Sequence, residues 1–552
     1  MENLSHAEGE RARQAAQAAT GVEFYPGTEL MTDAGSIHLE HTNKQQALVP
    51  QPSNDPSDPV NWSRTWKWLT MSSMALSTFN WVFSPLSLAP QVPYYIEAFD
   101  TTLPAVINFI GVSILVLGFT NFIWIPIARG LGRRPMALVT TLITTVSCIW
   151  RAKATTYNSF LGAAILCGIG ASPGETLGPV IITDVMFLHE RGFWMGLYQW
   201  AFWSGLMIGP IIAGVSADRH GWRSFWWIST AISVFTQVWI LFFLPETKRD
   251  RRPLAVNDTI AQVDTNSIRA KTDSTIDAKA DHISVVKEER SEDTSGPRVQ
   301  PVGKPNKRQF LPIAGWSVHE PIIGAIILPL KLARFPIVLW GSLQFTFSAS
   351  CFLMINITQS QALGSPPYNF SPTAVGYTNL ALFVGTSISL LTAGPLSDVV
   401  SRRATIKNNG VREPEMRLLT LIPFVVCFLV GCIILSVGWE YGWPWEVVVI
   451  VGFTLVGVQV AAISGIAVNY VVDCYKPAAG EFLVSATVFK NVWGYGMTKF
   501  MNDWVVQIGY LGPLLTITAL NFALLLFGAV PLYFFGKKLR KMSSKSSVHD
   551  VA

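Results

Sequence analysis

Residues 192–222 read GFWMGLYQWAFWSGLMIGPIIAGVSADRHGW, an apolar, aromatic-rich stretch that is interrupted by small residues. These small residues include Gly196, Gly205, Gly209 followed by Pro210, and Gly214. Glycines at such spacings let a membrane helix pack its backbone closely against a neighbour. The Gly-Pro pair bends or loosens the helix, which a bilayer tolerates when neighbouring helices satisfy the freed backbone groups. The stretch therefore predicts a tightly packed membrane helix in a moving bundle that carries a solute.

The composition of the whole chain is that of a membrane protein. Of its 552 residues, 50% are hydrophobic and 14% are charged, whereas an ordinary soluble domain has about 25% charged residues. Several apolar runs reach the roughly 20 residues that cross a bilayer as a helix. The net charge of +5 is too small to indicate a nucleic-acid partner. The six cysteines lie in or beside apolar runs, so we expect isolated buried thiols and no metal site.

Polar segments divide the chain into five parts. We expect a polar tail at 1–63, a first bundle at 64–245, a solvated linker at 246–334, a second bundle at 335–536 and a basic tail at 537–552. Each bundle contains six apolar runs, so the predicted fold is an all-α polytopic membrane protein with 12 transmembrane helices in two six-helix bundles. The predicted spans are 66–88, 104–126, 135–151, 158–183, 193–215, 224–244, 336–359, 374–396, 417–437, 446–472, 481–501 and 512–535.

Lysine and arginine are concentrated on one side of the predicted membrane. The loops of the opposite side carry Arg151, Lys153, Arg219 and Arg223. Because Lys and Arg are enriched in cytosolic loops, the richer side faces the cytosol, together with both termini and the linker. The loops of that richer side carry Arg129, Arg133, Arg134, Arg191, Arg402, Arg403, Lys407, Arg412, Arg417 and Lys476.

The two predicted bundles repeat each other in sequence. Arg133-Arg134 follows the second span, and Arg402-Arg403 follows the eighth. Asp184 ends the fourth span, and Asp473 ends the tenth. Parallel repeats of this kind place a solute site near the membrane midplane, between halves that rock against each other.

These patterns resemble the major facilitator superfamily, and within it the fungal members related to drug:proton antiporters. The strongest match is the motif of the fifth span, Gly196, Gly205, Gly209-Pro210 and Ala213-Gly214, in which Ala213 replaces a family glycine. The stretch DVMFLHERG at 184–192 is also similar. The resemblance implies a facilitator fold and export of drugs, toxins or secondary metabolites. Some relatives import organic cations or polyamines, so the resemblance leaves the direction open.

The chain departs from the family pattern at several positions. The loop after the second span has Ile125 and Arg129 where the family has Gly and Asp. The copy in the second half keeps Asp398 but has Ser401 in place of a glycine. In the fourth span, Ala164 occupies the position of an arginine that the family links to proton coupling. The resemblance therefore implies that coupling here does not use that arginine.

Two charged residues lie deep in predicted spans, where a charge costs on the order of 3 kcal/mol. Glu175 precedes Asp184 by nine residues and Lys490 follows Glu481 by nine, which puts each about 13 Å into the bilayer at roughly 1.5 Å per residue. We expect Glu175 and Lys490 to face the central cavity and to pair there, with a permanent packing ion pair as the alternative role. Neutral polar residues are weaker signals because they often join helices. Of those in the spans we favour Gln344, Gln459, Asn469 and Asn491 as solute contacts.

The loop motifs also suggest gates. The resemblance implies that Arg129 faces Glu481 and that Asp398 faces Arg191, with Arg402 and Arg403 beside them. Such pairs would close the cytosolic side, each contributing under about 1 kcal/mol if exposed. The alternative is that these residues are ordinary cytosolic loop charges.

The favoured function is therefore secondary active export of a small organic molecule by alternating access, against a proton gradient and across the plasma membrane. The chain has no P-loop motif for nucleotides, and its spans carry no catalytic constellation, so we expect a non-enzyme without cofactors. The expected partners are the solute, protons and lipid, with the protein as a monomer. Uptake of an organic cation or polyamine, with Glu175 as counter-ion, is one alternative. A membrane sensor built on a transporter scaffold is another.

Overall fold

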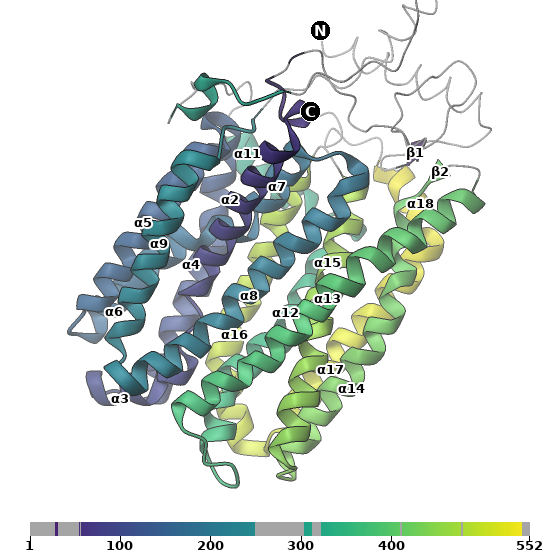
Figure 1. The fold of residues 1–552 in the computed structure, drawn as a ribbon. Coiled ribbons are helices and arrows are strands. Elements are labelled where there is room, and N and C mark those ends of the chain that lie inside the picture. The colour runs from purple at the N-terminus through teal and green to yellow at the C-terminus, as the bar shows by residue number, and fades with distance from the viewer. Residues whose placement is uncertain are drawn as a thin grey trace, which may run out of the picture.

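The computed structural model describes residues 28–30, 55, 57–248, 303–311, 322–408, 411–475 and 478–543. These residues form a long bundle of steeply inclined helices with the described ends of the chain at one end of the molecule (Figure 1). We call this the terminal end and the other the far end. Ten helices of the described residues are long and apolar enough to cross a membrane. Two further long helices, one rich in Ser and Thr and one charged, complete the predicted twelve.

The first half contains six of these spans. Its fourth span consists of three consecutive helical pieces. The elements are α2 (Arg64–Phe83), η2 (Ala89–Gln91), α3 (Val92–Phe99), α4 (Leu103–Leu131), α5 (Arg133–Lys153), α6 (Tyr157–Ala171), η3 (Ser172–Glu175), α7 (Leu177–Val185), α8 (Leu188–His220) and α9 (Arg223–Phe243).

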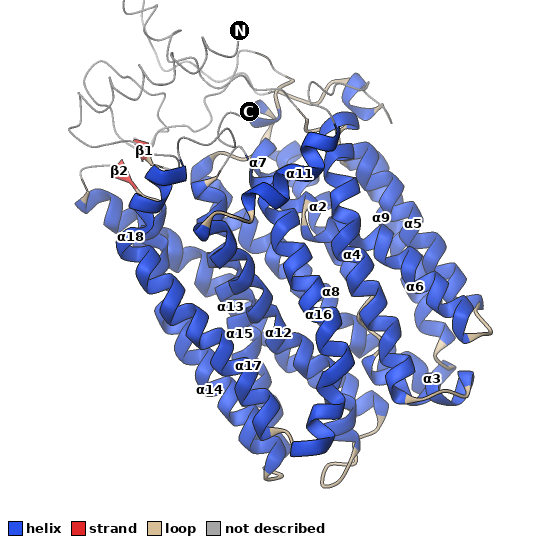
Figure 2. Cartoon of the chain, turned by 180° about the vertical axis from the view of Figure 1, so that it is seen from behind, coloured by secondary structure: helices blue, strands red, loops and turns tan. Residues whose placement is uncertain are grey.

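The second half contains the other six. The elements are α11 (Ile322–Leu332), α12 (Pro336–Gly364), α13 (Pro372–Lys407), η5 (Pro414–Thr420), α14 (Leu421–Glu440), the π-helical η6 (Glu446–Phe453), α15 (Thr454–Cys474), α16 (Ala479–Ile508), α17 (Leu511–Leu524), the π-helical η8 (Leu525–Ala529) and α18 (Val530–Ser543). The view from behind shows helices over almost the whole described height, with short loops at the ends (Figure 2). The all-α prediction is confirmed.

Two helices depart from their predicted spans for a backbone reason. The first span was expected at 66–88, but α2 ends at Phe83, two residues before Pro85. The fourth span changes to a 3-10 turn at Ser172–Glu175, where Pro173 supplies no backbone N–H. Proline removes a helical hydrogen bond, and a 3-10 stretch inside a helix is common at functional hinges. Glu175 therefore sits at a break and not in a continuous helix.

Two long seams join the halves: α8 packs along α13, and α4 packs along α16. The glycines of α8 make its close packing possible. A Cβ added at Gly205 would lie 2.7 Å from the carbonyl oxygen of Phe79 on α2, and one at Gly214 would lie 2.9 Å from that of Pro372 at the start of α13. Any side chain at these positions would push backbones apart. Pro210 is accommodated inside α8 without ending it.

Segments outside the spans add short ordered pieces at the terminal end. The strand β1 (Glu29–Leu30) pairs antiparallel with β2 (Val411–Arg412). The stretch η4 (Lys307–Phe310) docks on the first half, where Gln309 accepts a hydrogen bond from the backbone of Glu246 at 2.8 Å. The helix α11 packs against α16 and α4. These pieces of the predicted tail and linker are folded onto the bundles, whereas 249–302 lies outside the described residues.

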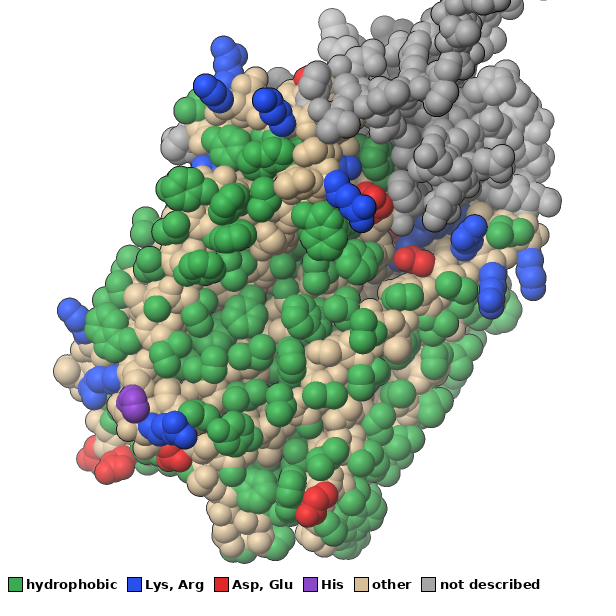
Figure 3. Space-filling view, viewed as in Figure 1, with side chains coloured by type: hydrophobic (Ala, Val, Ile, Leu, Met, Phe, Trp, Pro, Cys, Tyr) green, Lys and Arg blue, Asp and Glu red, His purple; other side chains and the backbone are tan. Residues whose placement is uncertain are grey.

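The outer surface fits a membrane protein. A broad zone of hydrophobic side chains covers the middle of the visible face, while Lys, Arg, Asp and Glu gather toward its two ends (Figure 3). Exposed residues of this kind include Phe119, Ile123, Phe235 and Phe242. Apolar surface of this extent is stable against lipid tails and not against water.

Candidate functional site: a central cavity with a buried ion pair

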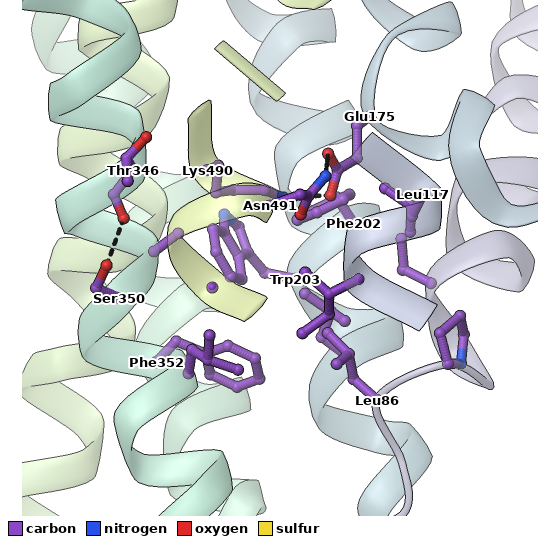
Figure 4. Close-up of a pocket in the computed structure, with 17 residues that line it drawn as sticks. Leu86, Leu117, Glu175, Phe202, Trp203, Thr346, Ser350, Phe352, Lys490 and Asn491 are labelled. Atoms are coloured by element: carbon purple, nitrogen blue, oxygen red, sulfur yellow. Dashed lines mark hydrogen bonds and ion pairs between the residues drawn. The ribbon is translucent and has the colours of Figure 1, made fainter. Parts of the chain in front are cut away.

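A cavity lies between the two halves. Its walls come from α2 and the loop after it, α4, η3 and α8 of the first half and from α12 and α16 of the second. Most lining side chains are apolar or aromatic, among them Phe202, Trp203 and Phe352, and Figure 4 shows these around a small group of polar side chains. Such a chamber suits an organic molecule with a large apolar surface.

The charged group of this cavity spans the two halves. Lys490 on α16 makes an ion pair with Glu175 Oε1, and Asn491 Nδ2 donates to Glu175 Oε2 at 3.1 Å. Figure 4 shows Lys490 and Asn491 reaching Glu175 from the opposite side of the cavity. The break at η3 positions the carboxylate, because Tyr198 on α8 donates to the carbonyl oxygen of Gly174 at 3.0 Å and holds the turn. The structure thus brings the predicted pair together.

Two aromatic rings complete the environment of the ammonium group. Lys490 Nζ lies 5.3 Å from the ring centroid of Phe202 and 5.2 Å from that of Phe345. Both distances are within the roughly 6 Å at which a ring face attracts a cation. Sequence reasoning missed both rings, since Phe is abundant in this chain and spacing alone does not mark those that face a cation.

The cost of desolvation makes this pair sensitive to change. Glu175 is 6% exposed, and burying a carboxylate is repaid only while a partner and hydrogen bonds remain. Because one partner belongs to each half, separation of the halves at this level must break the contact or move both side chains together. The pair is therefore placed to respond to a proton, to a charged solute or to opening of the cavity.

The other favoured polar residues lie elsewhere. Gln344 Nε2 donates to Asn521 Oδ1 at 2.8 Å, between α12 and α17 of the second half. Gln459 Oε1 accepts from Ser348 at 3.4 Å, between α15 and α12. Neither is among the described residues that line the central cavity. Their contacts are those of polar residues that join helices within one half.

Asn469 lines a second cavity nearer the terminal end. Its walls come from α8, α13, η5 and α15, and its polar side chains include Gln199, Asp398 and Arg417. The central and second cavities lie next to each other along α8. Phe202 and Trp203 of this helix line the central cavity, and Gln199 lines the second.

The expected gate residues divide into two groups. Arg129, at the end of α4, makes an ion pair with the fully buried Glu481 at the start of α16. Asp398 lies 4.0 Å from Arg417 and against Gly192, where an added Cβ would be 2.6 Å from its Oδ2.

Arg191, the expected partner of Asp398, donates to the carbonyl oxygens of Thr183 and Met186 at 3.1 Å each. Arg402 and Arg403 are exposed on the last turns of α13.

The repeated loop motifs form ion pairs that the sequence did not predict. Arg133 contacts Asp184 at 2.9 Å in the first half, and Arg417 contacts Asp473 at 3.2 Å in the second. Glu246 accepts hydrogen bonds from the backbone N–H groups of Arg133 and Arg134 at 2.9 and 3.1 Å. Because those groups begin α5, the carboxylate caps a helix N-terminus. The two repeated aspartates were the signal that could have located these pairs.

Arg151 corrects the charge count of the far-side loops. It was expected in a loop, but it is fully buried in α5, and its guanidinium lies 4.5 Å from the ring centroid of Trp226. Its Nη2 donates to Ser113 Oγ at 3.1 Å, and Ser113 also donates to the carbonyl oxygen of Ala164 at 3.2 Å. The ring of Trp226 and the hydroxyl of Ser113 partly offset the burial of this cation.

Comparison with known proteins agrees with this architecture. Residues 69–493 match the sequence pattern that defines the Major Facilitator Superfamily. The chain is 27% identical to "Uncharacterized MFS-type transporter C1271.10c" of Schizosaccharomyces pombe, over 95% of this chain and 94% of that protein. It is 24% identical to "Efflux pump radE" of Floropilus chiversii, over 93% and 89%.

The fold also resembles that of a solved transporter. The proton:xylose symporter XylE superposes with a TM-score of 0.56 at 12% identity, covering 86% of this chain and 96% of the symporter. At that identity the likeness concerns the fold alone. With the family pattern matched over most of its length, two helical halves and a chamber between them, the chain belongs to the major facilitator superfamily and is a multi-pass membrane transporter of the secondary active type.

Proposed function

We propose that this transporter exports a small organic molecule from the cytosol by alternating access, in exchange for protons. The observation that carries the proposal is the Glu175–Lys490–Asn491 group, which crosses the two halves inside an apolar, aromatic chamber. The chamber offers surface for a hydrophobic solute, and the group offers a carboxylate that a proton can neutralise. Similarity to a protein named as an efflux pump favours the outward direction.

Contacts between the halves lie on both sides of the chamber. Toward the terminal end, Arg129 pairs with Glu481. Toward the far end, Ser360 on α12 donates to the carbonyl oxygen of Ala89 at 2.6 Å, and Asp218 on α8 accepts from Thr373 on α13. Alternating access requires one set to open while the other holds. We take the terminal end as cytosolic because Lys and Arg are concentrated there. We propose the plasma membrane as the location of the transporter.

In the proposed cycle, the carboxylate of Glu175 both pairs with Lys490 and carries the proton. With the cytosolic side open, solute enters the chamber while Glu175 is ionised and paired with Lys490. Protonation of Glu175 from the outer side weakens that pair, since a neutral carboxyl no longer attracts the ammonium group. The solute leaves on the outer side, and the proton leaves to the cytosol when that side opens again. Net movement of a proton inward thereby drives the solute outward.

A vesicle experiment tests the direction and the coupling. Inside-out vesicles that contain the protein are loaded at acidic pH and diluted into neutral buffer with rhodamine 6G, a fluorescent organic cation. Gradient-dependent accumulation that is lost on collapse of the gradient and in Glu175→Gln supports exchange. Accumulation that ignores the pH gradient would contradict it. The Thr358→Val protein serves as the control, because Thr358 bonds its own helix at Met354.

Uptake of an organic cation is the second candidate. It is favoured by one observation: the ammonium group of Lys490 already occupies a site made of a carboxylate and two aromatic faces. Carboxylate plus aromatic faces is the chemistry that binds alkylated amines. In the same vesicles preloaded with rhodamine 6G, release of the dye that depends on the imposed gradient distinguishes uptake from export.

A further inference from the structure

A further cavity lies between the halves on the far side of the chamber. One wall comes from η2, α3 and α4, and the other comes from α12. The first wall is apolar and includes Val92, Ile107 and Ile110. The second wall has one aliphatic residue, Ile357, and three polar ones, Asn356, Ser360 and Gln361. We call it the outer cavity.

The outer cavity continues the central chamber by one helical turn on each element that they share. On α4, Ile114 lines the chamber and Ile110 lines the outer cavity. On α12, Phe352 lines the chamber and Asn356 the outer cavity. Residues three or four apart occupy one face of a helix. The two spaces therefore follow each other along the seam, and the outer cavity lies between the chamber and the far end of the molecule.

Asn356 is the unusual residue of this cavity. It is 1% exposed, and neither its Nδ2 nor its Oδ1 has a hydrogen-bond partner among the described residues. Gln361, five residues further along α12, also lines the cavity, and its Oε1 has no partner among the described residues. An unsatisfied buried polar group destabilises a fold, so such groups require an explanation. Two carboxamides facing one cavity are explained if something else supplies their partners.

The chemistry of the walls restricts that partner. None of the described residues lining the outer cavity is ionisable. A bare cation or anion would lose its hydration there without compensation. A carbonyl, amide or hydroxyl group on an apolar skeleton would satisfy Asn356 and leave its hydrocarbon surface against the isoleucines. The site thus fits a neutral hydrogen-bonding group and not a charged one.

Contacts that close the far end lie at the same place. Ser360 lines the outer cavity and its hydroxyl also makes the bond to Ala89 across the halves. On the same side, Thr373 of the second half donates to Asp218 of the first, and Tyr94 on α3 donates to the same carboxylate at 2.7 Å from within the first half. A molecule in the outer cavity would lie beside the Ser360–Ala89 contact, which must separate for the far end to open.

We propose that the outer cavity is a second solute site, in which Asn356 and Gln361 bind the neutral, hydrogen-bonding part of an amphiphilic molecule as it passes between the chamber and the far end. This rests on the proposed function for the role of the chamber, and it adds a substrate class: an apolar molecule that carries an amide, carbonyl or hydroxyl group. Charge recognition at Glu175 and neutral recognition at Asn356 are then separate.

A labelling experiment tests the site without knowledge of the natural solute. Ile357→Cys, at a residue that lines the outer cavity beside Asn356, and Thr358→Cys proteins in lipid vesicles are treated with N-ethylmaleimide, a small neutral carbonyl compound, and modification is followed by mass. We expect Cys at 357 to react several-fold faster than Cys at 358, with the wild-type chain giving the background of its native thiols. Because Asn356 is retained, octanamide should slow the reaction at 357 and octylammonium chloride should not. Equal rates at the two positions, no effect of octanamide, or equal effects of both additives would overturn the proposal.

A second measurement excludes a structural role of Asn356. If the Asn356 amide is free to bind a solute, then Asn356→Leu removes an unsatisfied group and should retain or raise the melting temperature. The Thr358→Val protein is measured beside it as the control. A clear fall in melting temperature in Asn356→Leu alone would show that Asn356 supports the fold, and would overturn the proposal.

The two proposals can fail separately. Both measurements above need no transport, so they keep their meaning if vesicles show no gradient-driven rhodamine movement. Conversely, gradient-driven movement that depends on Glu175 would stand even if the labelling at 357 is unprotected by octanamide.

Discussion

Arg129 and Glu481 join α4 of the first half to α16 of the second at the terminal end, and they are unequal partners: the side chain of Arg129 is 33% exposed, whereas that of Glu481 is fully buried. A pair on the surface contributes under about 1 kcal/mol. Here removal of the arginine would take one charge partner away from a fully buried carboxylate. The value of under about 1 kcal/mol expected for an exposed gate pair therefore underestimates this contact.

The first prediction follows from that asymmetry. Arg129→Ala should destabilise the protein by more than the roughly 1 kcal/mol of an exposed pair, approaching about 3 kcal/mol. Glu481→Gln should cost less, because it removes the buried charge. Thermal unfolding in nanodiscs measures both. Transport that is lost in Arg129→Glu and restored in Arg129→Glu with Glu481→Arg would show that the two side chains act as a pair. Failure of the double exchange to restore it would contradict this.

The second prediction concerns the ion pair of the chamber. Lys490→Met alone leaves Glu175 buried without its cation, which costs about 3–5 kcal/mol for a buried pair. Adding Glu175→Gln removes the stranded charge, so the double variant should regain most of the lost stability. Melting temperatures of the two single variants and the double variant form the test.

Transport measurements on the same variants distinguish a structural role of the Glu175–Lys490 pair from a role in proton coupling. The double variant should be folded but should no longer respond to an imposed pH gradient. A double variant that still moves rhodamine 6G in a gradient-dependent way would show that the pair is a packing contact.

How far the sequence predicted this site can be judged residue by residue. The positions of Glu175 and Lys490 followed from counting residues inward from the span ends, because depth along a helix is set by a fixed rise. The direction in which a side chain faces depends on the rotation of the helix about its axis. Counting residues from the span ends does not predict that rotation. Gln344 and Gln459 were favoured as solute contacts, yet they point into the second half toward Asn521 and Ser348.

Other features depended on tertiary contacts that no spacing encodes. Asn356 lies in a predicted span, and the residues next to it in the sequence do not distinguish it from other polar residues of the spans. Only the structure shows that it lines a cavity between α12 and α4. Arg151 looked like a loop charge because it lies at a span end, but Trp226 and Ser113 provide a buried place for it. The fold was more predictable, since the apolar runs and the glycines of α8 determine it locally.

The third prediction tests the glycines of the decisive stretch. Gly205→Ala would bring a Cβ to 2.7 Å from the backbone oxygen of Phe79, a contact that neither helix can relieve by rotating a side chain. Overpacking of this kind costs typically about 1–3 kcal/mol. The matched control is Gly496→Ala on α16, where an added Cβ meets nothing within 4 Å. The control should be neutral or slightly stabilising, because alanine favours a helix. Equal melting temperatures for the two variants would refute the close packing of α8 on α2.

The fourth prediction concerns the cap of α5. Glu246 is 5% exposed and accepts from the N–H groups of Arg133 and Arg134 at 2.9 and 3.1 Å. A carboxylate at a helix N-terminus satisfies orphan donors and complements the helix dipole. Glu246→Ala should therefore cost about 1–2 kcal/mol, and Glu246→Gln should cost less because one amide oxygen still accepts. Hydrogen exchange at the backbone of Arg133 and Arg134 gives the local readout.

Both N–H groups should exchange faster in Glu246→Ala and show an intermediate rate in Glu246→Gln. Lys248→Ala is a suitable control, because Lys248 donates its Nζ to the carbonyl oxygen of Gly130 and does not bond those two N–H groups. Unchanged exchange at both positions in Glu246→Ala would mean that water replaces the carboxylate at no cost. It would contradict the prediction that Glu246, in the segment after α9, stabilises the first turn of α5.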